Sequence, residues 1–333
     1  MKKTAIALAL ASVLGAACAQ SSVTVYGLAD LGLVLESGGP AGSVRKLSSG
    51  VEAGSRLGFK GTEDLGGGLA AYFVLESGIS MDTGAHNQGG LPFGRQALVG
   101  LKGGWGSVSL GRQYTPLFLA LDSVDPFGTG LAGASTNLFG YYPTSGNARM
   151  PNAVVYKSPE LGGFSGSVAY GFGEVAGNSS ANRQLGASIS YEQGPILLTL
   201  AHHSTNDASG SDSERTTLLG GAYDFGPVKL HLVFDTNRGI GSVRNDDALI
   251  GLSAPVGAGT LMVSYIRKND KSALNQDANQ AAIGYTYPLS KRTHIYTAYG
   301  RIHNENGAGY TVGNAIDGGT GDKAFNLGIV HKF

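Results

Sequence analysis

Apolar and polar side chains alternate along most of the chain. Between residues 184 and 192, Leu185, Ala187, Ile189 and Tyr191 share one face, while polar or small residues share the other. A period of two is typical of a β-strand with one apolar face. Sixteen such segments occur, and they predict strands that start near Ser22, Ser55, Leu69, Phe93, Ser107, Pro151, Phe164, Arg183, Ile196, Glu214, Val228, Asp246, Thr260, Gln280, Thr293 and Lys323.

The connections between these segments alternate between short and long. Tight turns occur at Asp64 to Gly68 and Gly226-Pro227, whereas Glu36 to Gly50 and His203 to Ser213 are longer polar segments. Each predicted strand with its connection takes about 20 residues, which fits a membrane strand of roughly 10 residues and its turn or loop. The pattern therefore predicts an all-β fold, a 16-stranded antiparallel transmembrane β-barrel.

Composition supports a barrel over the other fold classes. The 54 glycines among 333 residues disfavour a helical bundle, and no collagen period is present. A soluble β-sandwich also alternates, but a chain of this length would form several domains, and no linker is visible. The faces opposite the apolar ones are small and polar, including Gly58, Gly186 and Gly284, as expected for a wet lumen.

The N-terminal segment 1–19 has the features of a cleaved signal peptide. Lys2 and Lys3 precede an apolar run that ends in Ala17-Cys18-Ala19, a small-residue cleavage site. A transmembrane anchor needs a longer run, and lipid attachment at Cys18 is the weaker alternative. We therefore expect a single barrel domain over 20–333. The only cysteine, Cys18, is then removed, which excludes disulfides and cysteine metal sites.

One connection, residues 115–148, lacks convincing alternation. A loop of this length in a compact domain is usually functional. Folded into the lumen of a barrel, it narrows an aqueous channel; the alternative is a mobile surface loop.

The chain resembles the general porins of Gram-negative bacteria over essentially its whole length. The resemblance rests on Ser21-Ser22-Val23-Thr24-Val25-Tyr26-Gly27, Ser55-Arg56-Leu57-Gly58-Phe59-Lys60-Gly61-Thr62-Glu63-Asp64-Leu65-Gly66, Phe93-Gly94-Arg95-Gln96-Ala97, Leu110-Gly111-Arg112-Gln113-Tyr114 and a C-terminal Phe333. It implies a homotrimer of barrels in the lipid of the outer membrane, each with a pore that the third extracellular loop constricts. It also implies passive diffusion of ions and small hydrophilic solutes without a cofactor, and recognition of Phe333 by the outer-membrane insertion machinery.

The resemblance further implies that wall arginines line the constriction. The matching positions are Arg56, Arg95 and Arg149. Alternation places Arg56 and Lys60 on the lumen face, but it places Arg95 on the same face as apolar residues. Arg112 also shares a face with apolar residues, and we assign it to a subunit contact.

The candidate carboxylates on the loop are Asp122 and Asp125. The segment Asp125-Pro126-Phe127-Gly128 departs from the family pattern of a Glu beside Phe-Gly-Gly. For each charge, a solvated loop or rim position is the alternative. Three arginines and one lysine against two aspartates predict a weak to moderate anion preference, limited by salt screening across about 8 to 10 Å.

Other chemistry finds little support in the sequence. The 24 basic residues are balanced by 24 acidic ones, so no nucleic-acid partner is indicated. The adjacent His202 and His203 point to opposite strand faces, which does not favour a metal site. Catalytic motifs are absent, and we expect no enzyme. The alternatives to a porin are a barrel hydrolase that uses the loop His203 to Ser213, and an adhesin or structural barrel without an open pore.

Overall fold

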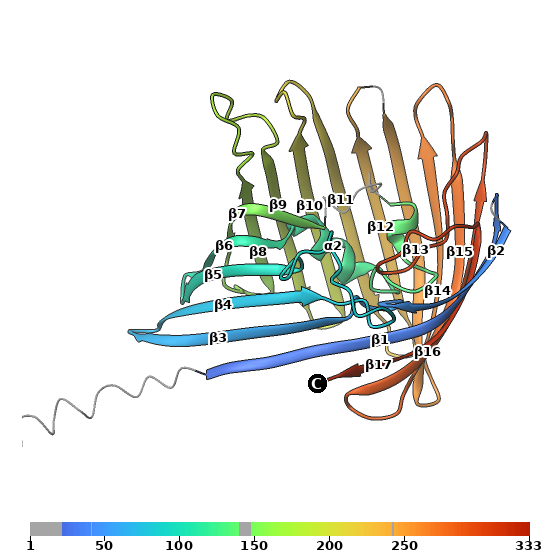
Figure 1. The fold of residues 1–333 in the computed structure, drawn as a ribbon, viewed down its shortest axis with the longest axis horizontal. Helices are drawn as coiled ribbons and strands as arrows, with labels where there is room; N and C mark the ends of the chain where they lie inside the picture. The colour runs from blue at the N-terminus through green and yellow to red at the C-terminus, as the bar shows by residue number, and fades with distance from the viewer. Residues whose placement is uncertain (1–21, 41, 140–147, 242) are drawn as a thin grey trace, which may run out of the picture.

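The computed structural model describes residues 22–40, 42–139, 148–241 and 243–333 (Figure 1). The predicted signal peptide lies outside the described residues. The strands are β1 (Ser22–Gly39), β2 (Gly42–Ser49), β3 (Arg56–Gly66), β4 (Leu69–Gly78), β5 (Gln96–Gly103), β6 (Gly106–Tyr114), β7 (Arg149–Lys157), β8 (Phe164–Gly171), β9 (Gln184–Gln193), β10 (Ile196–Asn206), β11 (Ser213–Asp224), β12 (Lys229–Arg238), β13 (Arg244–Val256), β14 (Gly259–Asp270), β15 (Ala278–Pro288), β16 (Thr293–Asn304) and β17 (Lys323–Lys332). Helix α2 (Pro116–Val124) and a 3-10 turn, η1 (Ser135–Asn137), lie between β6 and β7.

The strands form one closed antiparallel ring. From β3 to β17 each strand pairs with its neighbour in sequence, and β1 pairs with β17 to close the ring. β1 is long enough to pair on its other side with both β2 and β3, so the seventeen described strands fill sixteen wall positions. All sixteen predicted strands are present. The prediction of a polar loop at Glu36 to Gly50 is wrong, because β1 runs on to Gly39 and β2 follows it.

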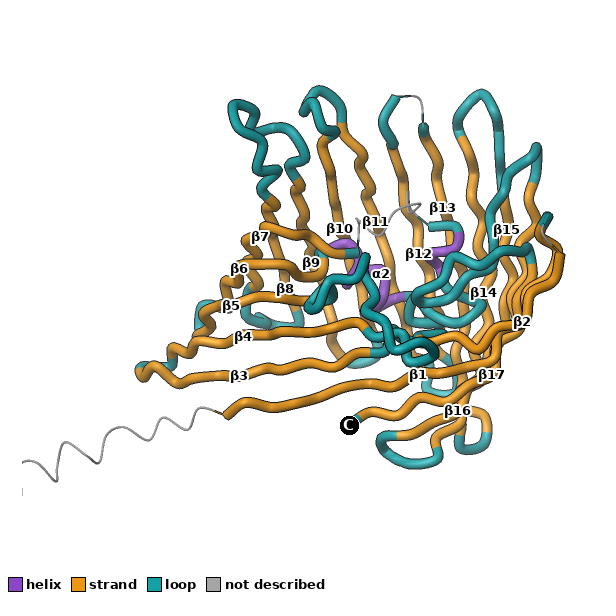
Figure 2. The backbone as a smooth tube through the Cα atoms, in the orientation of Figure 1, coloured by secondary structure: helices purple, strands orange, loops and turns teal. Residues whose placement is uncertain are grey.

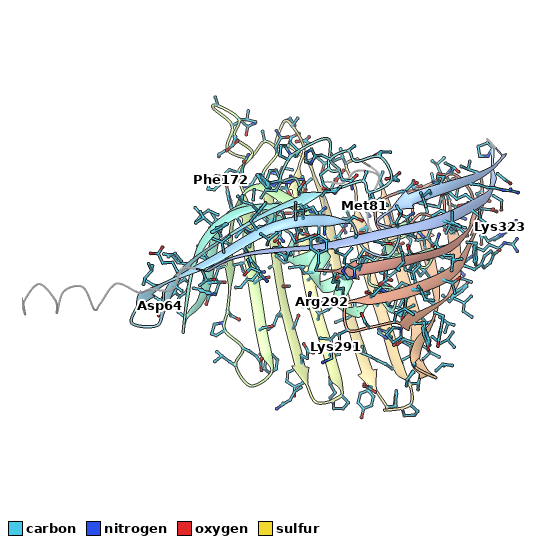
Figure 3. All side chains as sticks on the ribbon, turned by 60° about the horizontal axis from the view of Figure 1, so that its bottom comes forward. Asp64, Met81, Phe172, Lys291, Arg292 and Lys323 are labelled. Atoms are coloured by element: carbon cyan, nitrogen blue, oxygen red, sulfur yellow. The ribbon has the colours of Figure 1, made fainter. Side chains whose placement is uncertain are left out.

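Alternation along the strands separates an outer face from an inner face. On β12, Leu232 and Phe234 are exposed on the outside, whereas Val233 and Asp235 are buried inside. Lys291 and Arg292, labelled in Figure 3, belong to the short turn between β15 and β16. Among the described residues, no helix is long and apolar enough to cross a membrane.

The inner face is not uniformly polar. Along β10 to β17, buried apolar side chains of the wall form one cluster with apolar side chains of the segment between β6 and β7. Its members include Leu218, Val233, Leu249, Ile266 and Ile302 on the wall and Leu117, Leu121, Val124, Phe127 and Leu131 on the segment. The expectation of a wet inner face is therefore wrong for this side, where protein covers the wall. Figure 2 shows α2 inside the ring of strands.

Glycines on the inner wall leave room for this segment. A Cβ atom added at four of them would lie too close to the segment: 3.0 Å from Pro116 at Gly186, 2.7 Å from Val124 at Gly220, 2.6 Å from Pro126 at Gly251 and 2.7 Å from Phe127 at Gly284. His231 adds a hydrogen bond, its Nδ1 donating to the carbonyl oxygen of Val124 over 3.0 Å. The space that small wall residues leave is thus filled by the segment, which we call the infolded loop (115–139).

Candidate functional site

Three wall arginines gather around one tyrosine at the end of β6. The guanidinium groups of Arg95 and Arg149 both donate to the hydroxyl of Tyr114, Arg149 over 2.8 Å. Arg149 also lies over the Tyr114 ring, 4.5 Å from its centroid. Arg56 is close enough to Arg95 for the two charges to interact. The structure therefore brings together the three arginines that the resemblance singled out.

Arg56 is the first residue of β3, and its side chain lies on the inner face of the wall. The segment 50–55 leaves the wall between β2 and β3, and Arg56 Nε donates to the Gly54 carbonyl over 2.9 Å. Lys60, four residues further along the inner face of β3, has its Nζ 5.1 Å from the centroid of the Tyr26 ring. Lys60 therefore shares the lumen face with Arg56 but extends the positive wall away from the cluster.

Arg95 reaches the cluster although alternation places it outside. It precedes the first residue of β5 and lies in a bend, so the alternation of β5 does not extend to it. Its side chain is only 4% exposed, and its Nε lies 2.8 Å from Glu76 Oε1. The bend turns the guanidinium toward the lumen, whereas strict alternation would place it on the apolar outer face.

Two groups of this cluster were missed from the sequence. Glu76 on β4 pairs with Arg95 and accepts a hydrogen bond from the Tyr26 hydroxyl over 3.0 Å. Tyr26, which pairs with Gly58 across β1 and β3, therefore faces the lumen. The available signal was cross-strand register, since Glu76 is opposite Gly58, two residues from Arg56 on the same face.

The nearest acidic group of the infolded loop is Asp122 in the last turn of α2. Leu117, Leu121 and Val124 bury one face of this helix, whereas Asp122 lies on the exposed face. Its Oδ1 accepts a hydrogen bond from Thr129 over 2.9 Å. Partial desolvation raises its pKa above the usual aspartate value, and the Thr129 hydrogen bond and the charge of Arg56 act in the opposite direction.

Asp125 does not join the arginines. It is 5% exposed and accepts backbone hydrogen bonds from Phe127 at 2.9 Å, Thr129 at 3.1 Å and Ser135 at 3.0 Å. Burial raises its pKa. Its carboxyl group holds the turn after α2 together, so the role of Asp125 is to stabilise the fold of the infolded loop.

Arg112 lies where the pairing of β6 with β7 shifts register. It is partly exposed, and its Nε donates to the Gly94 carbonyl over 2.7 Å. Its hydrogen bond thus goes to Gly94 and not to Tyr114, while its charge acts on Arg149 of the cluster.

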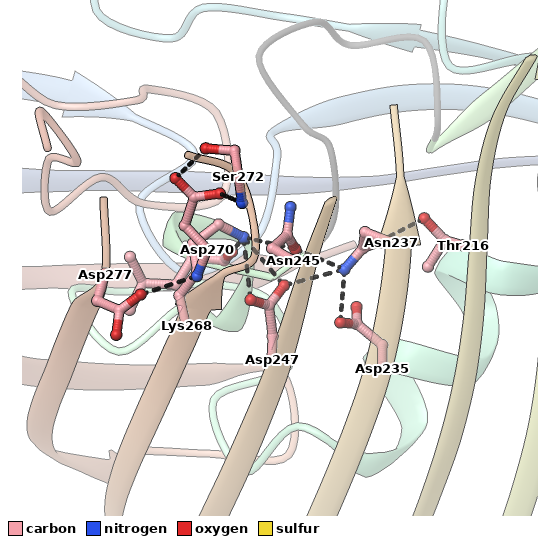
Figure 4. Close-up of polar contacts among 10 residues, drawn as sticks. Thr216, Asp235, Asn237, Asn245, Asp247, Lys268, Asp270, Ser272 and Asp277 are labelled. Carbon is pink, nitrogen blue, oxygen red and sulfur yellow. Dashed lines mark hydrogen bonds and ion pairs between the residues drawn. The ribbon is translucent and has the colours of Figure 1, made fainter. Parts of the chain in front are cut away.

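A buried polar network anchors the far end of the infolded loop (Figure 4). Lys268 Nζ donates to the carbonyl oxygen of Leu138 over 2.7 Å and lies 3.0 Å from Asp247. Asn237 Nδ2 donates to Asp235 and to Asn245, which links β12 with β13, and Lys268 Nζ donates to Asn245, which adds β14. The infolded loop is thus held by apolar contacts along its length and by one buried lysine near its end. The described residues contain no group of three His, Cys, Asp or Glu side chains placed to hold a metal ion.

Comparison with known proteins agrees with this architecture. A profile of the Gram-negative porin family matches residues 4–307. The outer membrane porin protein 32 of Delftia acidovorans is 35% identical over the full length of both chains. An outer membrane porin protein of Bordetella pertussis is 31% identical, also over the full length of both chains.

Solved structures show the same fold. The anion-selective porin from Comamonas acidovorans superposes with a TM-score of 0.81 at 32% identity, covering 94% of this chain and 100% of that one. OmpT of Vibrio cholerae, solved in a trimer form, shares the fold with a TM-score of 0.67 at 17% identity, covering 94% of this chain and 99% of that one. The chain belongs to the Gram-negative porin family, whose members are channels and not enzymes.

Proposed function

We propose that the chain forms an outer-membrane channel for passive diffusion of ions and small hydrophilic solutes, with a weak to moderate anion preference. The observation that carries the preference is the cluster around Tyr114. There, Arg149 binds Tyr114, Arg95 pairs with Glu76, and the charge of Arg56 acts on Asp122 of the infolded loop. The excess of one positive charge attracts anions, and salt screening over about 8 to 10 Å keeps the preference modest. The solved relative at 32% identity is described as anion-selective, which supports this sign.

Reversal potentials across planar bilayers with a KCl gradient test the proposal. We expect the wild-type channel to favour chloride and Arg56→Glu to move selectivity toward potassium. Arg292→Glu makes the same charge change at an exposed position of the β15–β16 turn, and we expect it to leave the potential unchanged. A cation-selective wild-type channel contradicts the proposal.

We further propose that three copies assemble, with Arg112 at the contact between subunits. Its partly exposed position beside β5 and the trimer form of one structural neighbour support this arrangement. Arg112→Glu is expected to lower the temperature at which the assembly dissociates in SDS gels. An unchanged dissociation temperature contradicts the assignment.

The proposal also covers export of the chain by its signal peptide and its insertion into the outer membrane. We expect cleavage after Ala19, so that Edman sequencing of the outer-membrane protein starts at Gln20. The terminal Phe333 is exposed, and its carbonyl accepts a hydrogen bond from the Gly27 amide over 2.9 Å. We expect Phe333 to be read by the insertion machinery, and Phe333→Ala to reduce the amount of folded protein in outer-membrane fractions.

A further inference from the structure

A short segment of the wall leaves the sheet beside the arginine cluster. Leu31 of β1 pairs with Ser49 at the end of β2, and Leu28 pairs with Arg56 at the start of β3. Only Ala29 and Asp30 on β1 therefore lie opposite the whole segment 50–55. Extra residues on one strand of a pair bulge out of the sheet. We call residues 50–55 the wall bulge.

The wall bulge contacts both sides of the constriction. Val51 is fully buried in the apolar cluster of the infolded loop, and its carbonyl accepts a hydrogen bond from the Leu131 amide over 2.8 Å. The Gly54 carbonyl binds Arg56 Nε, and a Cβ atom added at Gly54 would lie 2.6 Å from Arg95 Nη1. The wall bulge thus holds the infolded loop through one residue and two arginines through another.

The carboxylate of Asp30 fixes the conformation of the wall bulge. Asp30 is 0% exposed, and its Oδ2 accepts hydrogen bonds from the amides of Glu52 over 2.6 Å and Ala53 over 2.8 Å. Its backbone carbonyl accepts two more, from the Gly50 amide over 2.9 Å and the Ser55 hydroxyl over 3.0 Å. Buried backbone amides need acceptors, and Asp30 supplies them where the segment leaves the sheet.

Two side chains of β16 hold this arrangement from the other side. The Tyr296 hydroxyl donates to Asp30 Oδ1 over 2.7 Å, and His294 Nε2 lies 2.7 Å from Glu52 Oε2. None of the cations in the described ranges forms an ion pair with Asp30. A buried carboxylate without a cation depends on hydrogen-bond donors for its stabilisation. Tyr296 and the two bulge amides therefore determine where this carboxylate lies.

We propose that Asp30 is a positioning residue for the ion selectivity of the pore. By accepting the two amides, it keeps the wall bulge in the conformation that holds Arg56 and Arg95 at the lumen and seats Leu131. Without that acceptor, the bulge amides lose their partners, and Arg56 is no longer held at a fixed distance from the infolded loop. The inference rests on the proposed function, because the contribution of Arg56 to selectivity is what Asp30 maintains.

Reversal potentials of the full mature protein in planar bilayers with a KCl gradient test this inference. Asp30→Leu removes the acceptor at similar volume, and we expect it to lose at least half of the excess of chloride over potassium permeability. Asp30→Asn removes the charge but keeps one oxygen that can accept both amides, so it should restore the wild-type ratio. A direct effect of the lost negative charge would instead raise the chloride preference in both variants.

A double-mutant cycle shows whether Asp30 acts through Arg56. We expect Asp30→Leu to change the reversal potential much less in an Arg56→Gln background than in the wild type, because interacting positions are not additive. Asp64→Leu is the matched control. Asp64, labelled in Figure 3, also accepts a backbone amide, that of Gly66 over 2.9 Å. It lies eight residues from Arg56 on β3, roughly 26 Å along the strand, and should leave the ratio unchanged.

Three outcomes overturn the inference: a wild-type ratio in Asp30→Leu, a raised chloride preference in both Asp30 variants, or an equal effect of Asp30→Leu with and without Arg56. If Asp30→Leu does not assemble, Tyr296→Phe takes its place, with a smaller shift in the same direction expected and an unchanged ratio overturning the inference. A cation-selective wild type contradicts the proposed function alone, since the cycle compares each variant with its own parent.

Discussion

Adding a methyl group to the inner wall should push the infolded loop into the pore. In Gly220→Ala/Gly284→Ala, the new Cβ atoms would lie 2.7 Å from Val124 and 2.7 Å from Phe127. Ordinary contacts begin at 3.4 Å, so each neighbour must move by at least 0.7 Å, the difference between these distances. The wall is a hydrogen-bonded sheet, whereas the other side of the infolded loop faces the lumen. We therefore expect the infolded loop to move and the pore to narrow.

The energetic cost follows from overpacking. Extra methyl groups in a packed interior typically cost about 1 to 3 kcal/mol. Because this cost falls on contacts between the infolded loop and the wall, we expect a lower single-channel conductance in planar bilayers and a lower unfolding temperature. The effect on conductance should grow when Ala is replaced by Val at the same two positions.

The control is Gly221→Ala, on the same strand as Gly220 but on the outer face. There the nearest atom to a new Cβ, at 2.8 Å, is the end of the flexible Leu198 side chain. We expect unchanged conductance in this variant. If the double variant also keeps wild-type conductance, the infolded loop is not seated on these glycines and the reasoning is refuted.

Three other substitutions test the site. Asp122→Asn should raise the chloride preference at pH 7. Burial raises the pKa of Asp122, so acidification of the wild type should neutralise this group at a higher pH than an ordinary aspartate and should also raise the chloride preference. Reversal potentials should show a smaller response to acidification in the variant. Tyr114→Phe leaves two guanidinium groups without their shared acceptor, which should cost about 1.5 to 3 kcal/mol by chemical unfolding; a fully stable variant argues against the cluster. Lys268→Met leaves buried carboxylates uncompensated and should cost about 3 to 5 kcal/mol, with Lys291→Met at an exposed turn as the control.

The strands were predictable because a barrel wall imposes a strict period of two. The outer faces of β9, β12 and β15 follow that period over 185–191, 230–234 and 281–287. The prediction failed at β2, where the polar segment Glu36 to Gly50 was expected to be a loop. Lys46 is in fact paired with Glu36 on β1 and with Asp317 in the connection between β16 and β17, so the charge of Lys46 is balanced within the fold.

The site was less predictable because it depends on departures from regular structure. Alternation located Arg56 but not Arg95, whose position follows from a bend that a period cannot reveal. Sequence alone also gave no means of ranking Asp122 above Asp125, since both are loop carboxylates. Tyr141-Tyr142, within the predicted loop, lie outside the described residues.

The helical form of the infolded loop explains which carboxylate faces the arginines. On α2, Leu117, Leu121 and Val124 are spaced three and four residues apart and lie against the wall. Asp122 falls between them on the opposite face, toward the lumen, while Asp125 ends the helix and folds back to cap the next turn. The apolar core thus occupies the β10 to β17 side, and the remaining lumen lies between the exposed face of α2 and the arginine wall. It follows that exchanging the acidic residue of the lumen face with an apolar residue of the wall face, in Asp122→Leu/Leu121→Asp, should detach α2 from the wall. This variant should then lack a defined conductance. If this variant still gives a uniform wild-type conductance, the face of α2 does not determine the geometry of the pore.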